Sequence, residues 1–220
     1  MSADTVLDAA AVAGALARTG YRSLAAAEAR ALLDPADSAL SGNGWARFAA
    51  SWDDLRPDAF MADKGRYRLR RHAVFQAAPD GTPARRAPHR AHFQTTAHNH
   101  LNGGVERWFE PVDDAVGAST ALLTLIEGAR AVFDALLPDL SWLIEVHQFR
   151  ILARPDEAGQ PTPEGMHRDG VDGVLVLMVG RENVAGGVTG ISVDGVVTGE
   201  TFTLAEPLDC VLLDDHRVWH

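Results

Sequence analysis

The strongest constraint on the fold is the series of short apolar segments that follows residue 138. Apolar and β-branched residues fill stretches separated by Gly-rich turns, at residues 142–153, 171–179, 188–193, 201–204 and 208–213. Short strands at such spacing are typical of antiparallel sandwiches and barrels, whereas a doubly wound parallel sheet needs helices between its strands. The pattern predicts a mainly β structure of the jelly-roll or cupin type.

Helical periodicity marks other parts of the chain. Alanine-rich repeats end at Gly20 and before Pro35 and predict two N-terminal helices, the second beginning near Ser23. A longer amphipathic helix is predicted over residues 119–137, because Ser119 is a suitable N-cap and an apolar stripe follows it.

The length of 220 residues favours one domain over two. We expect a single α+β domain of residues 1–220. In it, a helical buttress of about residues 3–60 and the long helix of about residues 119–137 pack outside a β-barrel of about residues 66–220.

Composition limits the partners. The formal net charge of −10 repels a polyanion over most of the surface, so no nucleic acid is expected. The sequence has no uninterrupted membrane-spanning run and no basic-then-apolar secretory signal, so we expect a cytoplasmic protein with no membrane partner. Cys210 is the single cysteine and lies in an apolar run, which excludes an intrachain disulfide and predicts a buried thiol.

The pair His167 and Asp169 stands at the beginning of a predicted strand, between Gly165 and Gly170. Residues two apart in an extended strand point to the same face, so both side chains can converge on one metal ion. Two histidines and one carboxylate are a ligand set that suits non-haem Fe(II) with open coordination positions. A distal histidine is needed, and spacing leaves two alternatives, His216 and His220.

Other polar residues near this pair are weaker candidates. Asp172 is a rival carboxylate, but it falls on the opposite face of the strand. His98 and His100 have the same spacing without a carboxylate and lead into a turn. A simpler alternative is that His167 and Asp169 contact each other without a metal.

Strand-like alternation also occurs before the long helix. Residues 66–76 predict a half-buried strand with a solvated face of three arginines, Arg66, Arg68 and Arg70. Residues 92–97 and 105–109 flank an Asn-Gly-Gly turn signal and predict two paired strands.

Several motifs in order resemble one family. They are EVHQFR at residues 145–150, PTPEGMHRDG at 161–170, RENVAGG at 181–187 and DDHRVWH at 214–220, and NHLNGGVERWF at 99–109 is similar as well. From about Trp52 to the end, the chain resembles bacterial Fe(II)/2-oxoglutarate-dependent dioxygenases of the L-isoleucine 4-hydroxylase type, with biofilm and stress-response relatives. The resemblance implies a double-stranded β-helix. It also implies hydroxylation or S-oxidation of a free aliphatic L-amino acid, with release of succinate and CO2.

The resemblance implies the cofactor and its ligands. Fe(II) is expected on His167, Asp169 and His220, with 2-oxoglutarate and O2 as cosubstrates; the family pattern selects His220 over His216. Family members continue into a further strand whose arginine binds 2-oxoglutarate, and this sequence ends at His220. We therefore expect either a longer chain or impaired cosubstrate binding.

A free amino acid needs its carboxylate bound, and a bidentate arginine suits that role. Arg150 and Gln148 share strand parity and are expected to face the interior as substrate-binding residues, whereas His147 is expected to face away and pack. Arg107 and Asn99, beside the Gly-Gly turn, are further substrate-binding candidates.

Two alternatives to this function are a cupin-like protein with a different metal and a non-catalytic binding or regulatory module. Succinate release that depends on iron, 2-oxoglutarate and an amino acid separates the enzyme from both. The expected partners are a small amino acid and O2, and a homodimer is the expected assembly.

Overall fold

The computed structural model describes residues 7–61, 67–96, 98–100, 103–162 and 165–220. The helices are α1 (Ala9–Thr19), α2 (Ala26–Leu33), α3 (Gly42–Ala50), the 3-10 helix η1 (Ser51–Asp54), α4 (Asp114–Gly117) and α5 (Thr120–Leu136). The longer strands are β1 (Tyr21–Leu24), β3 (Arg68–Ala77), β5 (Trp142–Ile151), β6 (Gly173–Leu177), β7 (Thr189–Val193), β8 (Val196–Phe202) and β9 (Cys210–Asp214). The short strands are β2 (Arg56–Pro57), β4 (Arg85–Arg86) and β10 (Val218–Trp219).

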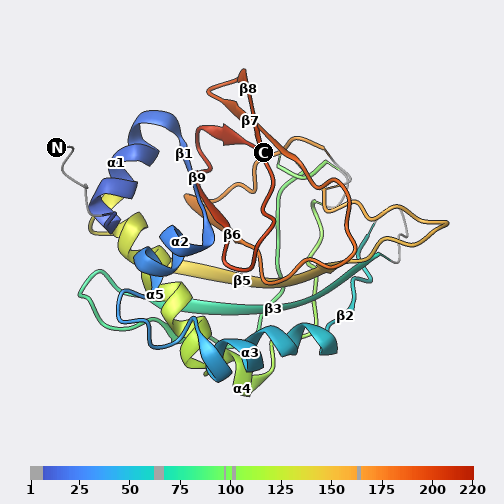
Figure 1. The fold of residues 1–220 in the computed structure, drawn as a ribbon, viewed down its shortest axis with the longest axis horizontal. Helices are drawn as coiled ribbons and strands as arrows, with labels where there is room; N and C mark the ends of the chain where they lie inside the picture. Colours follow the sequence, from blue (N-terminus) through green and yellow to red (C-terminus); the bar gives the residue numbers. More distant parts are fainter. Residues whose placement is uncertain (1–6, 62–66, 97, 101–102, 163–164) are drawn as a thin grey trace.

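Strands β3 and β5 are the longest pair. They pair antiparallel along their full lengths, from Arg68 opposite Ile151 to Ala77 opposite Trp142, and cross the molecule side by side (Figure 1). Alternation gives this ladder two different faces. One packs its apolar residues, such as Phe75, into the helical core, and the other holds polar residues that include His147.

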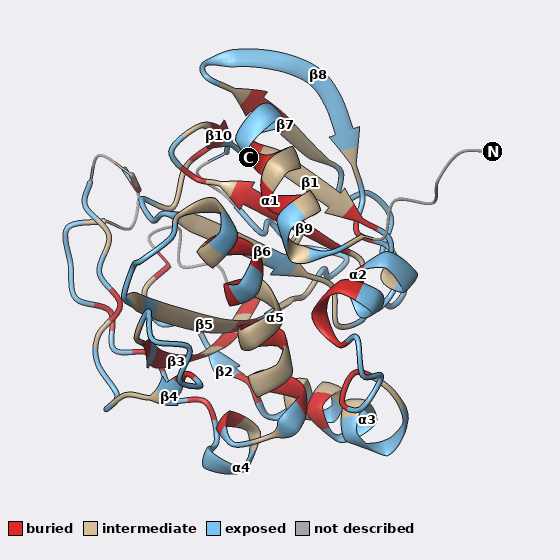
Figure 2. Ribbon diagram, turned by 90° about the vertical axis from the view of Figure 1, so that its left-hand side faces the viewer, coloured by how far each residue is buried: buried red, intermediate tan, exposed pale blue. Residues whose placement is uncertain are grey.

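The remaining long strands and the short strand β10 form two small sheets, ordered β1-β9-β6 and β10-β7-β8. Strand β9 lies at the centre of the first sheet and its residues Cys210 to Leu213 are buried, whereas β8 is exposed at the edge of the second (Figure 2). Every ladder between these named strands is antiparallel. The protein is therefore a mixed α+β structure with mostly antiparallel sheets, and the pairing among its described residues does not close into one barrel.

Helix α5 connects the helical layer to the sheets. Ser119 caps it by accepting a hydrogen bond from the backbone of Leu122, as predicted, and its apolar stripe packs into the main core. Gly128 lets α2 approach closely, because a Cβ there would lie 2.7 Å from the Cα of Leu33. Within the described residues, no helix is both long and apolar enough to cross a bilayer.

Several boundaries differ from the sequence predictions. Residues near Ser23 form β1 instead of the beginning of a helix, because they pair with β9 and α2 begins only at Ala26. Strand β8 begins at Val196, well before the predicted residue 201. Cys210 is buried as expected, and burial raises the pKa of its thiol to about 12.

The predicted solvated arginine face is wrong. Arg68 and Arg70 are 6 % and 4 % exposed and both contact the buried carboxylate of Asp58, at 2.8 and 3.4 Å. Arg66 lies outside the described residues. The arginines were expected to be solvated by water. Instead one buried carboxylate binds both, and the rings of Phe109 and Phe149 flank Arg70.

The predicted hairpin over residues 92–109 is reduced to a short bridge. His92 and Arg107 exchange backbone hydrogen bonds of 3.0 and 2.9 Å, and Gly104 donates to the carbonyl of Gln94. The predicted turn residue Asn102 is outside the described residues. Gly103 has no room for a side chain, because a Cβ would lie 2.3 Å from the carbonyl oxygen of Asn99.

Candidate metal centre and its surroundings

Three predicted metal ligands meet at the entry of β6 and the exit of β10. Nε2 of His167 lies 3.6 Å from Oδ1 of Asp169, and Nε2 of His220 lies 3.7 Å from Oδ2 of the same carboxylate. One ligand atom from each residue lies within 4.8 Å of the others. The structure thus brings together side chains that are more than fifty residues apart in sequence, with a separation that one metal ion can bridge.

Backbone contacts hold the two ligand segments side by side. The amide of His167 donates to the carbonyl of His220 at 3.1 Å, and the amide of His220 donates to the carbonyl of His167 at 3.0 Å. The carboxylate of Asp215 accepts from the amides of Asp169, Gly170 and Val171 at 2.7 to 3.0 Å. Asp215 is 2 % exposed, so it fixes the loop that carries Asp169 against the segment that carries His220.

Gly170 is required in this loop. Its φ of +80° favours glycine, and a Cβ there would lie 2.5 Å from Nδ1 of His98. The loop that carries His167 and Asp169 therefore turns sharply directly after Asp169, where it packs against His98.

The alternative ligands lie apart from this group. Nε2 of His216 is 2.9 Å from Oδ1 of Asp172, and both side chains are largely exposed. His98 contacts the hydroxyl of Thr95 at 3.1 Å, and His100 is exposed. Tertiary structure thus groups His220, and not His216, with the His167 and Asp169 pair.

The charge of the group follows from its neighbours. Burial alone would raise the pKa of the Asp169 carboxyl, but the rings of His167 and His220 outweigh it and hold that pKa well below its usual range. The carboxylate is therefore ionised over the whole neutral range, as a metal ligand must be.

Gln94 is a site neighbour that sequence reasoning missed. Its amide nitrogen donates to the backbone carbonyl of Asp169 at 3.1 Å and lies 3.4 Å from its Oδ1. The amide oxygen of Gln94 accepts from Arg107 at 2.7 Å and from Asn99 at 3.3 Å. Arg107 and Asn99, predicted for substrate binding, are therefore buried, and Gln94 connects them to the metal loop, the loop that carries His167 and Asp169. No short spacing signal in the sequence would have identified Gln94.

Strand β5 faces the opposite way from the prediction. Gln148 donates to the hydroxyl of Ser51, and Arg150 lies 3.0 Å from a carboxylate oxygen of Asp53, so both side chains point to η1 and the helical layer. His147 instead lies on the polar face with Glu145. The parity was correct, but alternation alone does not tell which face meets the helices.

The polar face of β3 and β5 carries a second cluster. His72, His92, Glu145 and His147 each offer a ligand atom within 4.8 Å of the others. Burial lowers the pKa of His147 to about 3 and also lowers the pKa of His72. Burial alone would raise the pKa of Glu145, but the surrounding histidine rings hold it well below its usual range. The imidazoles of His72 and His147 are therefore neutral beside an ionised carboxylate.

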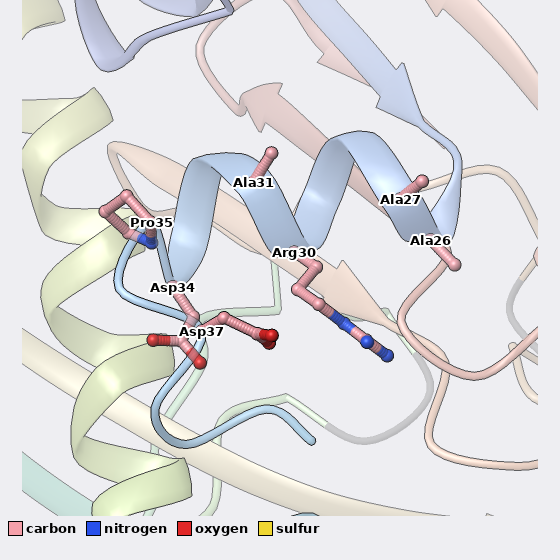
Figure 3. A pocket seen from close by; sticks show the side chains of 7 residues that line it. All are labelled: Ala26, Ala27, Arg30, Ala31, Asp34, Pro35 and Asp37. Atoms are coloured by element: carbon pink, nitrogen blue, oxygen red, sulfur yellow. The ribbon is translucent and has the colours of Figure 1, made fainter.

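The surface hollow on α2 is a different feature. It has a volume of about 410 Å³ and is lined mainly by small side chains (Figure 3). Asp34, one of the two aspartates that line it, accepts hydrogen bonds from the backbone of Ser38, Ala39 and Leu40, so it shapes the turn after α2. No member of either cluster lines this hollow.

Comparison with known proteins decides the family. The model of the 2OG-Fe dioxygenase family matches residues 49–220, which include both clusters. The chain belongs to this family. It is a non-haem iron dioxygenase whose reaction uses Fe(II) and 2-oxoglutarate, and the family also implies O2 and a small-molecule substrate.

Solved structures support the same fold for this dioxygenase. A BsmA homologue from Methylobium petroleophilum PM1 has 35 % sequence identity and a TM-score of 0.85, over 98 % of this chain and 84 % of that chain. IDO from Bacillus thuringiensis has 14 % identity and a TM-score of 0.67, over 100 % and 87 %. The Fe(II)/α-ketoglutarate-dependent dioxygenase TqaL has 17 % identity and a TM-score of 0.68, over 96 % and 78 %. No curated protein sequence matches the chain significantly.

The donor set at His167 fits the iron of a dioxygenase. Nδ1 of His167 donates to the carbonyl of Gly165 at 3.0 Å, which fixes the tautomer whose Nε2 lone pair faces Asp169. Nε2 of His220 is buried and has no hydrogen-bond partner among the described residues. A buried nitrogen without a partner is unfavourable unless a ligand takes its lone pair, so the site is suited to a metal ion.

Proposed function

We propose that this dioxygenase holds its iron on His167, Asp169 and His220 and hydroxylates, or S-oxidises, a free aliphatic L-amino acid. The observation that carries the metal assignment is the convergence of two imidazoles and one carboxylate around the buried Nε2 of His220, which makes no hydrogen bond within the described residues. With these two nitrogens and one oxygen as protein ligands, an iron ion would keep open positions for 2-oxoglutarate and O2.

The protein groups have separate roles in this proposal. Bound iron with 2-oxoglutarate supplies the oxidising chemistry, with succinate and CO2 as products. Asp169, with a side chain 34 % exposed, lies on the open side of the group, whereas His167 and His220 are mostly covered, at 11 % and 12 %. Substrate and cosubstrate would therefore approach over Asp169, and Asp215 keeps the three ligands in register.

The amino-acid substrate is proposed from the sequence motifs. Arg107 and Asn99 lie beside the metal loop through Gln94, so their segment is the nearest proposed contact for a substrate carboxylate. Arg150 and Gln148 stay predicted substrate residues, although their contacts with η1 make Arg107 the first to test. The single domain of residues 1–220 and the double-stranded β-helix, or jelly-roll, arrangement are also part of the proposal, with the mostly antiparallel sheets as support.

The decisive experiment measures succinate release by the purified chain with Fe(II), 2-oxoglutarate and a panel of free amino acids, beside iron content. We expect one or more amino acids to raise succinate release in wild type and His216→Ala, and His167→Ala to lose both turnover and its site iron. His216 is the matched control, because it is the other distal histidine candidate and is exposed. Full iron binding and turnover in His167→Ala would refute the metal assignment, and a panel without effect would refute the substrate class.

A further inference from the structure

The second cluster is built by strand register and one loop. His72 on β3 pairs with His147 on β5, and Val74 pairs with Glu145, so His72 and Glu145 are diagonal neighbours on one face. His92 comes from the bridged segment that also carries Arg107, and its ring packs edge-on against His72 and His147. Three separate segments thus bring their side chains to one point outside the His167 group.

Glu145 lies close to two histidines, but the ring of one of them, His72, lacks hydrogen bonds in the part of the chain that the structure describes. Oε2 of Glu145 lies 2.7 Å from Nδ1 of His92, and Oε1 lies 3.5 Å from Nε2 of His72. His72 is fully buried, and neither of its ring nitrogens makes a hydrogen bond within the described residues. Buried imidazoles normally have a partner on at least one nitrogen, so hydrogen bonding alone does not account for His72.

The fourth member, His147, has a different role. The Arg70 guanidinium lies 2.6 Å from Nδ1 of His147, and because arginine only donates, Nδ1 must accept. In the neutral ring the proton is then on Nε2, the nitrogen that faces Glu145 at 3.9 Å. His147 therefore directs an N–H group toward the carboxylate. It has no free lone pair on that side with which to bind a metal ion.

We infer that His72, His92 and Glu145 bind a second divalent transition-metal ion, separate from the iron at His167. Two imidazole nitrogens and a carboxylate oxygen suit Zn²⁺ and its neighbours in the first transition series. On binding, the metal would take the Nδ1 lone pair of His92, and the imidazole would carry its single proton on Nε2. The ion would tie the 92–107 segment to β3 and β5, and this segment carries the Gln94 contact to the iron loop.

The test uses the full chain freed of metal and then dialysed against Zn²⁺, with metal per chain measured by mass spectrometry. We expect two equivalents in wild type, one in Glu145→Gln, one in His167→Ala and none in the double variant. One control is expected to keep both equivalents. His89→Ala removes an exposed histidine beside His72 that is outside the ligand group.

The possible results separate this inference from the proposed iron site. One equivalent in wild type that is lost in His167→Ala and kept in Glu145→Gln would overturn the second site and leave the iron site intact. One equivalent that is lost in Glu145→Gln and kept in His167→Ala would support the second site and refute the iron assignment.

A second measurement needs no change in the cluster. In His167→Ala, whose second cluster is intact, Zn²⁺ should slow amide hydrogen exchange at His92 and Arg107, because the ion holds their bridged segment. Unchanged exchange at saturating Zn²⁺ would overturn the inference, even if Glu145→Gln failed to fold.

Discussion

The two histidine clusters differ in how the chain builds them. His167 and Asp169 are two residues apart at the entry of a strand, and only His220 is brought from a distance. The second cluster takes His72, His92 and Glu145 from three distant segments, and its geometry depends on the register of β3 against β5. The first cluster has two of its residues in one short motif, whereas His72, His92 and Glu145 are joined by no common motif, because strand register is a property of the folded sheet.

The largest effect on this comparison is expected from Asp215, which holds the first cluster together. Asp215→Ala leaves three amides of the metal loop without their buried acceptor, so we expect a loss of about 3 kcal/mol in unfolding free energy. Chemical denaturation of the metal-free protein measures it. Asp214→Ala is the control, because Asp214 accepts one exposed amide and should cost less than about 1 kcal/mol. Equal losses of unfolding free energy in both variants would show that Asp215 does not hold the loop of Asp169 in place.

A smaller effect is expected from Gln94, which links the two regions. Gln94→Ala removes the contact with the loop of Asp169, and outer partners of metal ligands typically change affinity by about tenfold or more. Titration of the metal-free chain with Fe(II) without oxygen should show this weakening with little change in fold. Gln76→Ala is the matched control, because that glutamine is exposed on β3. Unchanged affinity in Gln94→Ala would mean that the contact does not orient the ligand.

The smallest effect is expected from Asp34, which lies in neither cluster. Burial would raise the pKa of Asp34, but the amides of Leu40, Ala39 and Ser38 outweigh it and the pKa is lowered. A carboxyl with a lowered folded pKa stabilises the protein above its unfolded pKa, and this stabilisation is lost as pH falls through the folded value.

Asp34→Asn should therefore cost about 1 kcal/mol at neutral pH, and the difference from wild type should shrink in acid below the usual aspartate pKa. Denaturation at a series of pH values measures it. Added metal should leave the difference unchanged, since Asp34 is in neither cluster. A difference that grows in acid would contradict the direction of the pKa shift.

Sequence patterns predicted the parts of the fold that local rules control. Helix α5 begins after Ser119 as expected, because an N-cap and a 3.6-residue apolar stripe are encoded within the helix itself. Strands β5, β6, β7 and β9 fall within the predicted apolar segments or end one residue beyond them. Strand β1 was missed, since Tyr21 to Leu24 are extended only through pairing with β9.

The buried arginines show why other expectations failed. Alternation predicted which residues of β3 share a face, but it gave no sign that Asp58 and two phenylalanine rings would cover Arg68 and Arg70. The same limit reversed the two faces of β5, where Arg150 meets η1 and His147 meets Arg70. Burial of a polar face depends on which distant segment covers it.

The sequence by itself determined the mainly antiparallel strands, the long helix and the closeness of His167 to Asp169, because each follows from spacing within one short stretch of the chain. Tertiary structure decided that His220 joins this pair while His216 meets Asp172, and that His72, His92 and Glu145 meet at all. These groupings arise from strand register and loop packing, which bring together residues with no relation in spacing along the chain.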